Sequence, residues 1–171
     1  ESDKARLKLA YFDNHVKDYL TRTTVQLEGW VSAPVIENID NADFKGYEIT
    51  AEYRTPRFFS ELSGSYYTYT NFCHSDRAYP TKSEPCHPGG VTDSYASNHV
   101  PPRASGALTL GTHQLDQRLT AGGRVSYTGN RPTLPRASSI IPVVDWGSYV
   151  LVDLFANYRI NEHVALDLSV D

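Results

Sequence analysis

The sequence has no methionine, only two cysteines and no long uninterrupted apolar run. A helix that spans a bilayer needs about 20 consecutive apolar residues, so we expect no transmembrane helix. The first residues, Glu1-Ser2-Asp3, lack the basic and apolar regions of a signal peptide. A chain without Met is not expected to be a complete translation product, and we interpret these 171 residues as part of a longer protein.

An excess of basic residues is also missing, because 16 Lys and Arg stand against 20 Asp and Glu, for a formal net charge of -4. Nucleic-acid-binding surfaces are basic, so this balance argues against a nucleic-acid partner. The common catalytic motifs are absent too: there is no Gly-rich phosphate loop, no His-Glu-x-x-His and no Gly-x-Ser-x-Gly. We therefore expect no catalytic residues and no enzyme activity.

The sequence does contain an alternation of apolar and polar residues with a period of two, which is typical of β-strands. In the last segment Val164, Leu166, Leu168 and Val170 alternate with polar residues. Similar alternation predicts seven strands, each about long enough to cross a bilayer when tilted, at 4–11, 44–54, 58–71, 104–112, 118–128, 148–158 and 163–171.

Short and long connections alternate strictly along the chain. The short connections are 55–57, 113–116 and 159–162, and the long ones are 15–36, 72–102 and 129–147. All long connections therefore emerge from one end of the sheet, as in an outer-membrane barrel with short periplasmic turns and long extracellular loops. The predicted fold is an all-β, antiparallel, up-and-down transmembrane β-barrel, present here as an incomplete seven-stranded section with open edges.

The alternation also predicts which side chains share a face. The outward, apolar face should carry Leu7, Leu9, Ile49, Tyr53, Leu108, Leu110, Val125, Val150, Val152, Leu166 and Leu168. The inward, polar face should carry Glu48, Glu52, Arg118, Arg124 and Asp167. Aromatic residues gather near both strand ends, as rings do at two membrane–water interfaces. In a soluble β-sandwich the same polar residues would simply be solvated, so a sandwich that binds a ligand such as a carbohydrate is the alternative from a different class.

Three runs carry a family resemblance. The run 37–53 contains Asn38, Ala42, Gly46 and Glu48 in the spacing Asn-x-x-x-Ala-x-x-x-Gly-x-Glu. This run resembles a segment of TonB-dependent outer-membrane receptors, and the runs 149–160 and 164–171 are similar to the penultimate hairpin of that family. Within that family, the amino-acid sequences of these two runs are most similar to those of haem and haemophore receptors.

The resemblance implies a plugged barrel of 22 strands in the bacterial outer membrane, of which residues 1–171 would be roughly the fifteenth to the twenty-first strands. The plug domain, the last strand and the region that contacts TonB would lie outside this chain.

The implied function is TonB-energised import of an iron source, most similar to that of haem or haemophore receptors, with a siderophore receptor as the alternative. The implied partners are the extracellular haem, haemophore or siderophore, TonB, the lipid bilayer and lipopolysaccharide. The transported haem or iron chelate is a ligand, and no intrinsic cofactor is expected. A passive porin would share the barrel without a plug.

Two Cys-His pairs lie in the longest connection, Cys73-His74 and Cys86-His87. Adjacent Cys and His lack the usual spacing of zinc ligands, so a zinc site is disfavoured, although zinc and free thiols both remain open. The pattern favours a disulfide between Cys73 and Cys86, with no metal, in an oxidising compartment.

The same connection holds the candidate ligand-facing residues, which are His74, His87, His99, Tyr79 and Tyr95. Imidazole and phenolate groups both ligate haem iron. Most exposed loop histidines have no special role. The resemblance implies that the extracellular haem-ligating His of haemophore receptors lies on an earlier loop and that the other haem ligand lies on the plug. We nevertheless expect the connection 72–102 to carry ligand contacts, because loops on a rigid scaffold are where recognition usually resides.

Overall fold

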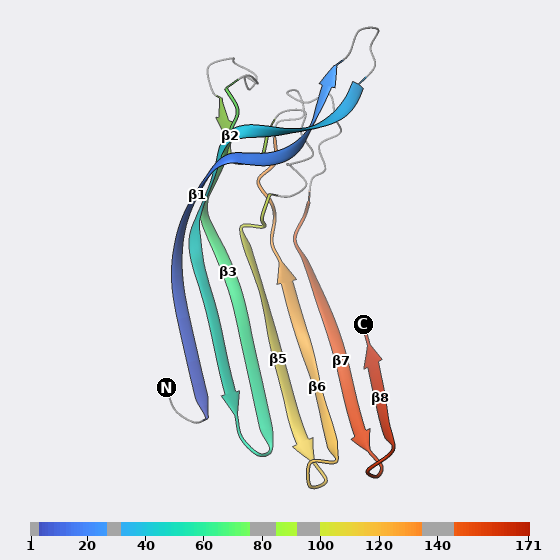
Figure 1. Cartoon of the computed structure of the whole chain (residues 1–171). Helices are drawn as coiled ribbons and strands as arrows, with labels where there is room; N and C mark the ends of the chain where they lie inside the picture. The colour runs from blue at the N-terminus through green and yellow to red at the C-terminus, as the bar shows by residue number, and fades with distance from the viewer. Residues whose placement is uncertain (1–3, 27–31, 76–84, 92–99, 135–145) are drawn as a thin grey trace.

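The computed structural model describes residues 4–26, 32–75, 85–91, 100–134 and 146–171. Its strands are β1 (Ala5–Gln26), β2 (Ser32–Arg54), β3 (Phe58–Cys73), β4 (Cys86–His87), β5 (Ala104–Gln114), β6 (Leu119–Thr128), β7 (Tyr149–Arg159) and β8 (Ala165–Val170). They form one antiparallel sheet in the order β1-β2-β3-β5-β6-β7-β8, with β4 paired to β3 (Figure 1). Within the described residues, no helix has both the length and the apolar character needed to span a membrane.

All seven predicted strands are present, and short and long connections alternate between the two ends of the sheet as predicted after β2. The three short turns gather at one end of the sheet and the long connections at the other (Figure 1). The sheet has two unpaired edges, at β1 and β8, and no second layer covers it within the described part of the chain. The predicted all-β, antiparallel, incomplete barrel section is confirmed.

The prediction of a long connection over 15–36 is wrong for most of its length. β1 runs on to Gln26 and β2 begins at Ser32, so the two strands stay paired through this region. Alternation is hidden here because polar residues occupy both faces, with His15 and Lys17 on the face of Tyr11 and with Asn14 and Asn38 on the other. The two-residue strand β4 was also not predicted.

One lateral row of cross-strand partners shows which side chains share a face of the sheet. Ala51 of β2 lies opposite Leu62, Leu62 opposite Leu108, Leu108 opposite Val125, and Val125 opposite Val152. Cross-strand partners point to the same face, so the apolar face continues from β1 to β8. All eleven residues predicted for the apolar face lie on it, and Glu48, Glu52, Arg124 and Asp167 lie on the opposite face.

Arg118 departs from the prediction, because it lies in the turn between β5 and β6 and not in a strand. The Arg118 amide donates to the carbonyl of Leu115 at 3.1 Å, which closes the turn. Leu115, Asp116 and Gln117 all have positive φ, at 52°, 52° and 67°. The alternation of residue types continues past the end of the strand and hides this turn.

Aromatic rings bound the apolar face at both ends. Tyr11, Tyr47 and Tyr66 form one lateral row towards the loop end, where the rings of Tyr11 and Tyr47 are 5.3 Å apart. Tyr53 and Phe58 lie together near the short turns, with ring centroids 6.3 Å apart. Six residues separate Tyr47 from Tyr53, which is roughly 20 Å along a strand. The aromatic residues therefore flank the apolar stretch at both ends, as the aromatic girdles of an outer-membrane barrel flank its lipid-facing band.

Glycines on the polar face make room for aromatic rings from neighbouring strands. Phe59 and Phe155 lie over Gly111 and Gly122, and the two rings stack with their centroids 6.5 Å apart. A Cβ on Gly111 would lie 2.2 Å from the Phe59 ring, and a Cβ on Gly122 would lie 2.3 Å from the carbonyl oxygen of Leu110. These four residues fix the lateral packing of β3, β5, β6 and β7.

The β1–β2 hairpin bends near its middle, and its outer part crosses over the loop ends of the neighbouring strands (Figure 1). Asp18 lies in this part of β1 with φ of 52°, and it is skipped between the pairs of Lys17 with Asn41 and Tyr19 with Ile39. Asp is one of the few residues that adopt this left-handed conformation at low cost. The bend brings the outer hairpin close to the loop that follows β3.

Replacing Gly122 with Ala should lower the free energy of unfolding by about 1–3 kcal/mol, because the backbone carbonyl of Leu110 cannot move aside without breaking the ladder. The matched control is Gly64→Ala, whose Cβ would lie no closer than 3.3 Å to any neighbour. The melting temperature of each variant is measured on the full protein. Samples are heated to a series of temperatures, and the folded barrel is separated from the unfolded chain by its mobility in gel electrophoresis without boiling. Equal melting temperatures of the two variants would show that the glycine packing is not needed.

Candidate binding surface at the long-loop end

A buried apolar cluster of the described residues lies between the outer hairpin and the loop that follows β3. Ile39 and Ala42 of β2, Phe72 of β3, and Val91 and Val100 of the connection between β4 and β5 are all at most 2% exposed. Tyr19 and Phe44 pack against this cluster, and the Phe44 and Phe72 rings meet edge to face at 5.6 Å. The cluster therefore holds both stems of the connection 92–99 against the hairpin.

The disulfide predicted between Cys73 and Cys86 is present, with an S–S distance of 2.04 Å. These cysteines are cross-strand partners in the short pairing of β3 with β4, next to Phe72 and His87. The Thr70 hydroxyl donates to the carbonyl of Pro88 at 3.2 Å and continues this attachment. The disulfide thus closes the stem of a loop whose other residues, 76–84, lie outside the described part of the chain.

A second attachment joins the start of that loop to β2. Asp40 accepts hydrogen bonds from the Ser75 amide at 2.7 Å and from the Ser75 hydroxyl at 3.3 Å. Asp40 lies in β2 at the level of Asp18, between the pairs of Lys17 with Asn41 and Tyr19 with Ile39. The loop stem is therefore fixed on one side by the disulfide and on the other by this carboxylate.

His74, one of the candidate ligand residues, is buried between these two attachments with 5% of its surface exposed. Its amide donates to the carbonyl of Pro85 at 2.8 Å. Neither ring nitrogen makes a hydrogen bond within the described residues, and Nε2 lies 3.6 Å from a carboxylate oxygen of Glu37. In this conformation the imidazole packs in the joint between loop and hairpin and does not face solvent.

His87 is half-buried, and its Nδ1 accepts a hydrogen bond from the Gly89 amide at 2.9 Å. Tyr79, Tyr95 and His99 lie outside the described residues, so their predicted roles stay predictions. The structure brings His74 and His87 to neighbouring positions beside the disulfide, but it does not direct either ring into a shared site.

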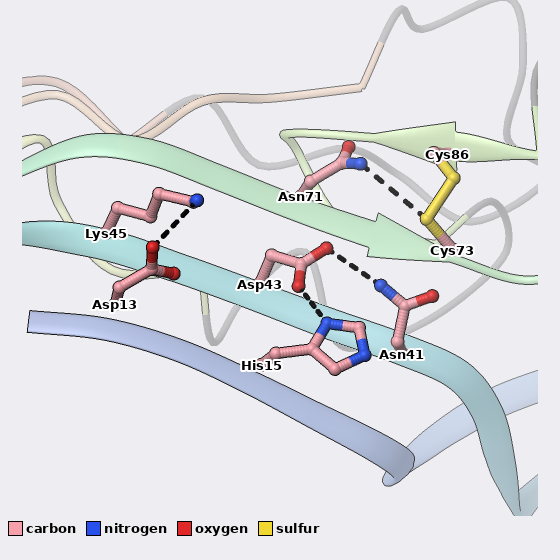
Figure 2. Close-up of polar contacts among 8 residues, drawn as sticks. All are labelled: Asp13, His15, Asn41, Asp43, Lys45, Asn71, Cys73 and Cys86. Carbon is pink, nitrogen blue, oxygen red and sulfur yellow. Dashed lines mark hydrogen bonds and ion pairs between the residues drawn. A yellow bond between two sulfur atoms is a disulfide. The ribbon is translucent and has the colours of Figure 1, made fainter.

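A polar patch lies on β1 and β2 beyond the upper aromatic row, on the same face as Tyr11 and Tyr47 (Figure 2). The carboxylate of Asp43 contacts the His15 ring and accepts a hydrogen bond from Asn41 at 2.8 Å. Lys45 donates to Asp13 at 2.9 Å, and this hydrogen bond and the Asp13 charge raise the pKa of the Lys45 amine. The patch marks where the apolar face gives way to polar surface.

Two arginines pack on aromatic rings at the same level. The Arg103 guanidinium lies 5.9 Å from the centroid of the Tyr66 ring, and that of Arg131 lies 5.2 Å from the Trp146 ring. A hollow of about 500 Å³ is lined by both arginines, Tyr66 and Tyr127. A second hollow of about 330 Å³ adjoins it through Arg103 and Pro132, and is lined mainly by Tyr67, Thr68, Tyr69, Thr70, Asn71, Pro88 and Pro101.

Sequence reasoning missed this patch and both hollows. The patch was missed because alternation predicts strands only at 4–11 and 44–54, so Asp13, His15, Asn41 and Asp43 fall outside them. The arginine contacts were missed because the aromatic partners come from other segments. Arg103 and Arg131 stand just outside predicted strands, beside aromatic residues at strand ends. This position beside aromatic residues is the feature of the sequence that could have indicated the contacts between arginines and rings. Within the described ranges, no group of three or more His, Cys, Asp or Glu side chains could hold a metal ion.

Comparison with known proteins gives a family match over the full chain. The family described as TonB dependent receptor-like, β-barrel, matches residues 1–171. No curated protein matches the sequence.

Several solved structures share the fold. The FrpB iron transporter from Neisseria meningitidis (F3-3 variant) is 18% identical with a TM-score of 0.66, over 99% of this chain and 24% of that one. The siderophore receptor PirA from Acinetobacter baumannii is 12% identical with a TM-score of 0.62, over 99% and 25%. A double mutant of the Serratia marcescens hemophore receptor HasR, in complex with its hemophore HasA and heme, is 24% identical with a TM-score of 0.61, over 98% and 24%. The chain thus spans about a quarter of the length of each.

Replacing both cysteines with serine should loosen the loop stem without disrupting the sheet, because β4 pairs only with β3. The loop-closure model gives about 3 kcal/mol for a loop of this size, which here acts on the loop and not on the barrel. Limited proteolysis of the full protein should cut within 74–86 at least several-fold faster in the variant. Unchanged cleavage there would show that Asp40 and the apolar cluster hold the stem alone.

Proposed function

The chain belongs to the family of TonB dependent receptor-like β-barrels, and on this premise we propose that the full protein is an outer-membrane receptor that imports an iron source with energy delivered through TonB. The match over the whole chain is the observation that carries this proposal. The exposed apolar face, bounded by two levels of aromatic rings, supports the location. A soluble sandwich would need a second sheet on that face, and the described residues supply none.

The residues of this chain would supply barrel wall and loops. We infer a plugged barrel of 22 strands in which these strands are roughly the fifteenth to the twenty-first, with the plug, the last strand and the TonB-contacting region encoded elsewhere in the full protein. The outer hairpin and the connections after β3 and β6 would then form part of the extracellular surface. Substrate would bind at that surface, and TonB would drive rearrangement of the plug.

The substrate that we propose is haem or a haem-carrying protein. Similarity to the hemophore receptor HasR supports this choice, as do the Tyr- and His-containing segments of the loop after β3. Tyr rings are common anchors in protein recognition, and imidazole and phenolate groups ligate haem iron. A ferric siderophore is the alternative, supported by the similarity to the siderophore receptor PirA. In either case the iron compound is cargo, and no resident cofactor is proposed.

A growth assay tests this function. The full receptor, expressed in a strain that lacks its own haem and siderophore receptors, should restore growth on haem or haemoglobin as the sole iron source. It should fail to do so when TonB is deleted, because transport depends on energy. Growth on ferric siderophores alone would favour the alternative substrate. Equal growth with and without TonB would contradict active transport and favour a passive porin.

The loop after β3 should carry part of the substrate contact. Replacing 76–84 with Gly-Gly-Ser keeps Ser75 on Asp40 and Pro85 on His74, so the stem should remain folded. We expect the affinity for the imported ligand to fall by about tenfold or more, because the segment contains the candidate anchor Tyr79 and loss of one such anchor typically costs about 2 kcal/mol. The matched control replaces 135–145 with the same linker. Unchanged affinity for haem, haemoglobin and ferric siderophores in the first variant would show that this loop is only a covering.

A further inference from the structure

His74 lies at the joint where the stem of the loop after β3 is attached to β2 and β4. Its amide donates to the carbonyl of Pro85 at 2.8 Å, and the amide of the next residue, Ser75, donates to the Asp40 carboxylate at 2.7 Å. The preceding residue, Cys73, forms the disulfide. Three attachments of the stem therefore start from three consecutive residues, and His74 is the middle one.

The imidazole of His74 is buried without hydrogen bonds. The residue is 5% exposed, and neither Nδ1 nor Nε2 has a hydrogen-bond partner within the described residues. A neutral imidazole carries one N–H donor and one acceptor, and burying such groups unpaired costs free energy. A phenyl ring would fill a similar space without that cost. The polar ring therefore indicates a role other than packing.

Carboxylates lie close to this ring. An oxygen of Glu37 is 3.6 Å from Nε2, which is within ion-pair range but too long for a hydrogen bond. Asp40, three residues further along β2, is a second carboxylate in the joint. From β4, the titratable neighbour is His87, whose Nδ1 accepts a hydrogen bond from the Gly89 amide. The immediate charge on the hairpin side of the joint is therefore negative.

The cations of β1 belong to other parts of the hairpin. Arg22 lies opposite Ile36, whose exposed fraction of 72% places this pair on the solvent-facing side. Lys17 lies opposite Asn41, in the row of the disulfide. Among the described residues, the Glu37 carboxylate is the charged group in ion-pair range of the imidazole. A proton on the ring would therefore gain a favourable interaction with Glu37.

We propose that His74 and Glu37 form a pH-sensitive switch that tightens the loop stem on β2 as the pH falls. Imidazole groups gain a proton between about pH 8 and pH 5, while most carboxylates stay ionised above about pH 5. With a proton taken from solvent, the ring donates from Nε2 to Glu37, and this charge-assisted hydrogen bond joins stem to hairpin. The Glu37 side chain is 31% exposed and stays partly hydrated, which lowers the cost of the pair. Without that proton, the ring packs in the joint and contributes no bond.

The switch has a consequence for ligand binding that rests on the proposed function. A tighter stem leaves less conformational freedom for a ligand to remove when it binds the loop after β3. Ligands that contact this loop would therefore bind more tightly in acidic surroundings than in alkaline ones.

Hydrogen–deuterium exchange of the full receptor, without ligand, tests the switch. Exchange of the His74 and Ser75 amides is followed by mass spectrometry at about pH 5.5 and about pH 8, with labelling times scaled to the chemical exchange rate at each pH. Protection of these amides should be about tenfold greater at the lower pH, the scale of one charge-assisted hydrogen bond. The Tyr67 amide, which donates to the carbonyl of Arg103 at 2.9 Å, is the internal reference and should keep the same protection.

Three variants separate the switch from a general effect of pH. His74→Phe keeps a ring in the joint but cannot gain a proton, and Glu37→Gln removes the charge of its partner. Both should abolish the increase in protection at low pH. The matched control is His15→Phe, because His15 also contacts a β2 carboxylate, that of Asp43, but lies outside the joint. This variant should respond to pH as the unaltered receptor does.

Equal protection of the two amides at both pH values, or greater protection at pH 8, would overturn the proposal. So would a full response in His74→Phe or in Glu37→Gln, since the response would then come from another group. If His74→Phe does not fold, Glu37→Gln decides the question. Because exchange is measured without ligand or TonB, failure of the growth assay would contradict the proposed transport function and leave the switch standing. Exchange that does not depend on pH would refute the switch and leave the transport function intact.

Discussion

Backbone pairing in one continuous register is the constraint on which the rest of this structure depends. Side chains on neighbouring strands share a face only while every strand keeps its register, and a slip by one residue in any strand would move its apolar side chains to the polar face. The rows of partners from β1 to β8 meet this condition, and the Phe rings over Gly111 and Gly122 fit only in this register. The apolar band, the aromatic rows and the placement of the loops all follow from it.

Much of the fold could be predicted from alternation, because one face must be apolar wherever it contacts lipid. The prediction failed where that requirement ends. Beyond Tyr11 the β1–β2 hairpin carries polar residues on both faces, with Asp13 and His15 on the face of Tyr11 and with Asn14 and Asn38 on the other, so no periodic signal marks the strands. The error at Arg118 has the opposite cause, since the pattern of residue types continues into a turn that backbone conformation closes.

The candidate site was less predictable, because its contacts join segments far apart in the sequence. The disulfide could be predicted from two cysteines in one connection, but its surroundings could not. Nothing in the local sequence indicates that Asp40 holds Ser75, that His74 is buried beside Glu37, or that Arg103 packs on a ring 37 residues earlier. Such contacts depend on the bend of the hairpin and on the spacing of strands, which are properties of the assembled sheet.

The closed stem of the loop after β3 has a consequence for how this protein can change over evolutionary time. The Cys73–Cys86 disulfide and the Ser75–Asp40 hydrogen bonds attach the stem to the sheet through residues that flank 76–84, so these attachments do not depend on which residues occupy that segment. The entropic cost of closing a loop grows slowly, by roughly 0.6 kcal/mol for each doubling of its length. Insertions and substitutions in this segment are therefore nearly neutral for assembly. The segment can therefore change in length and sequence while the attachments of its stem to the barrel wall stay the same.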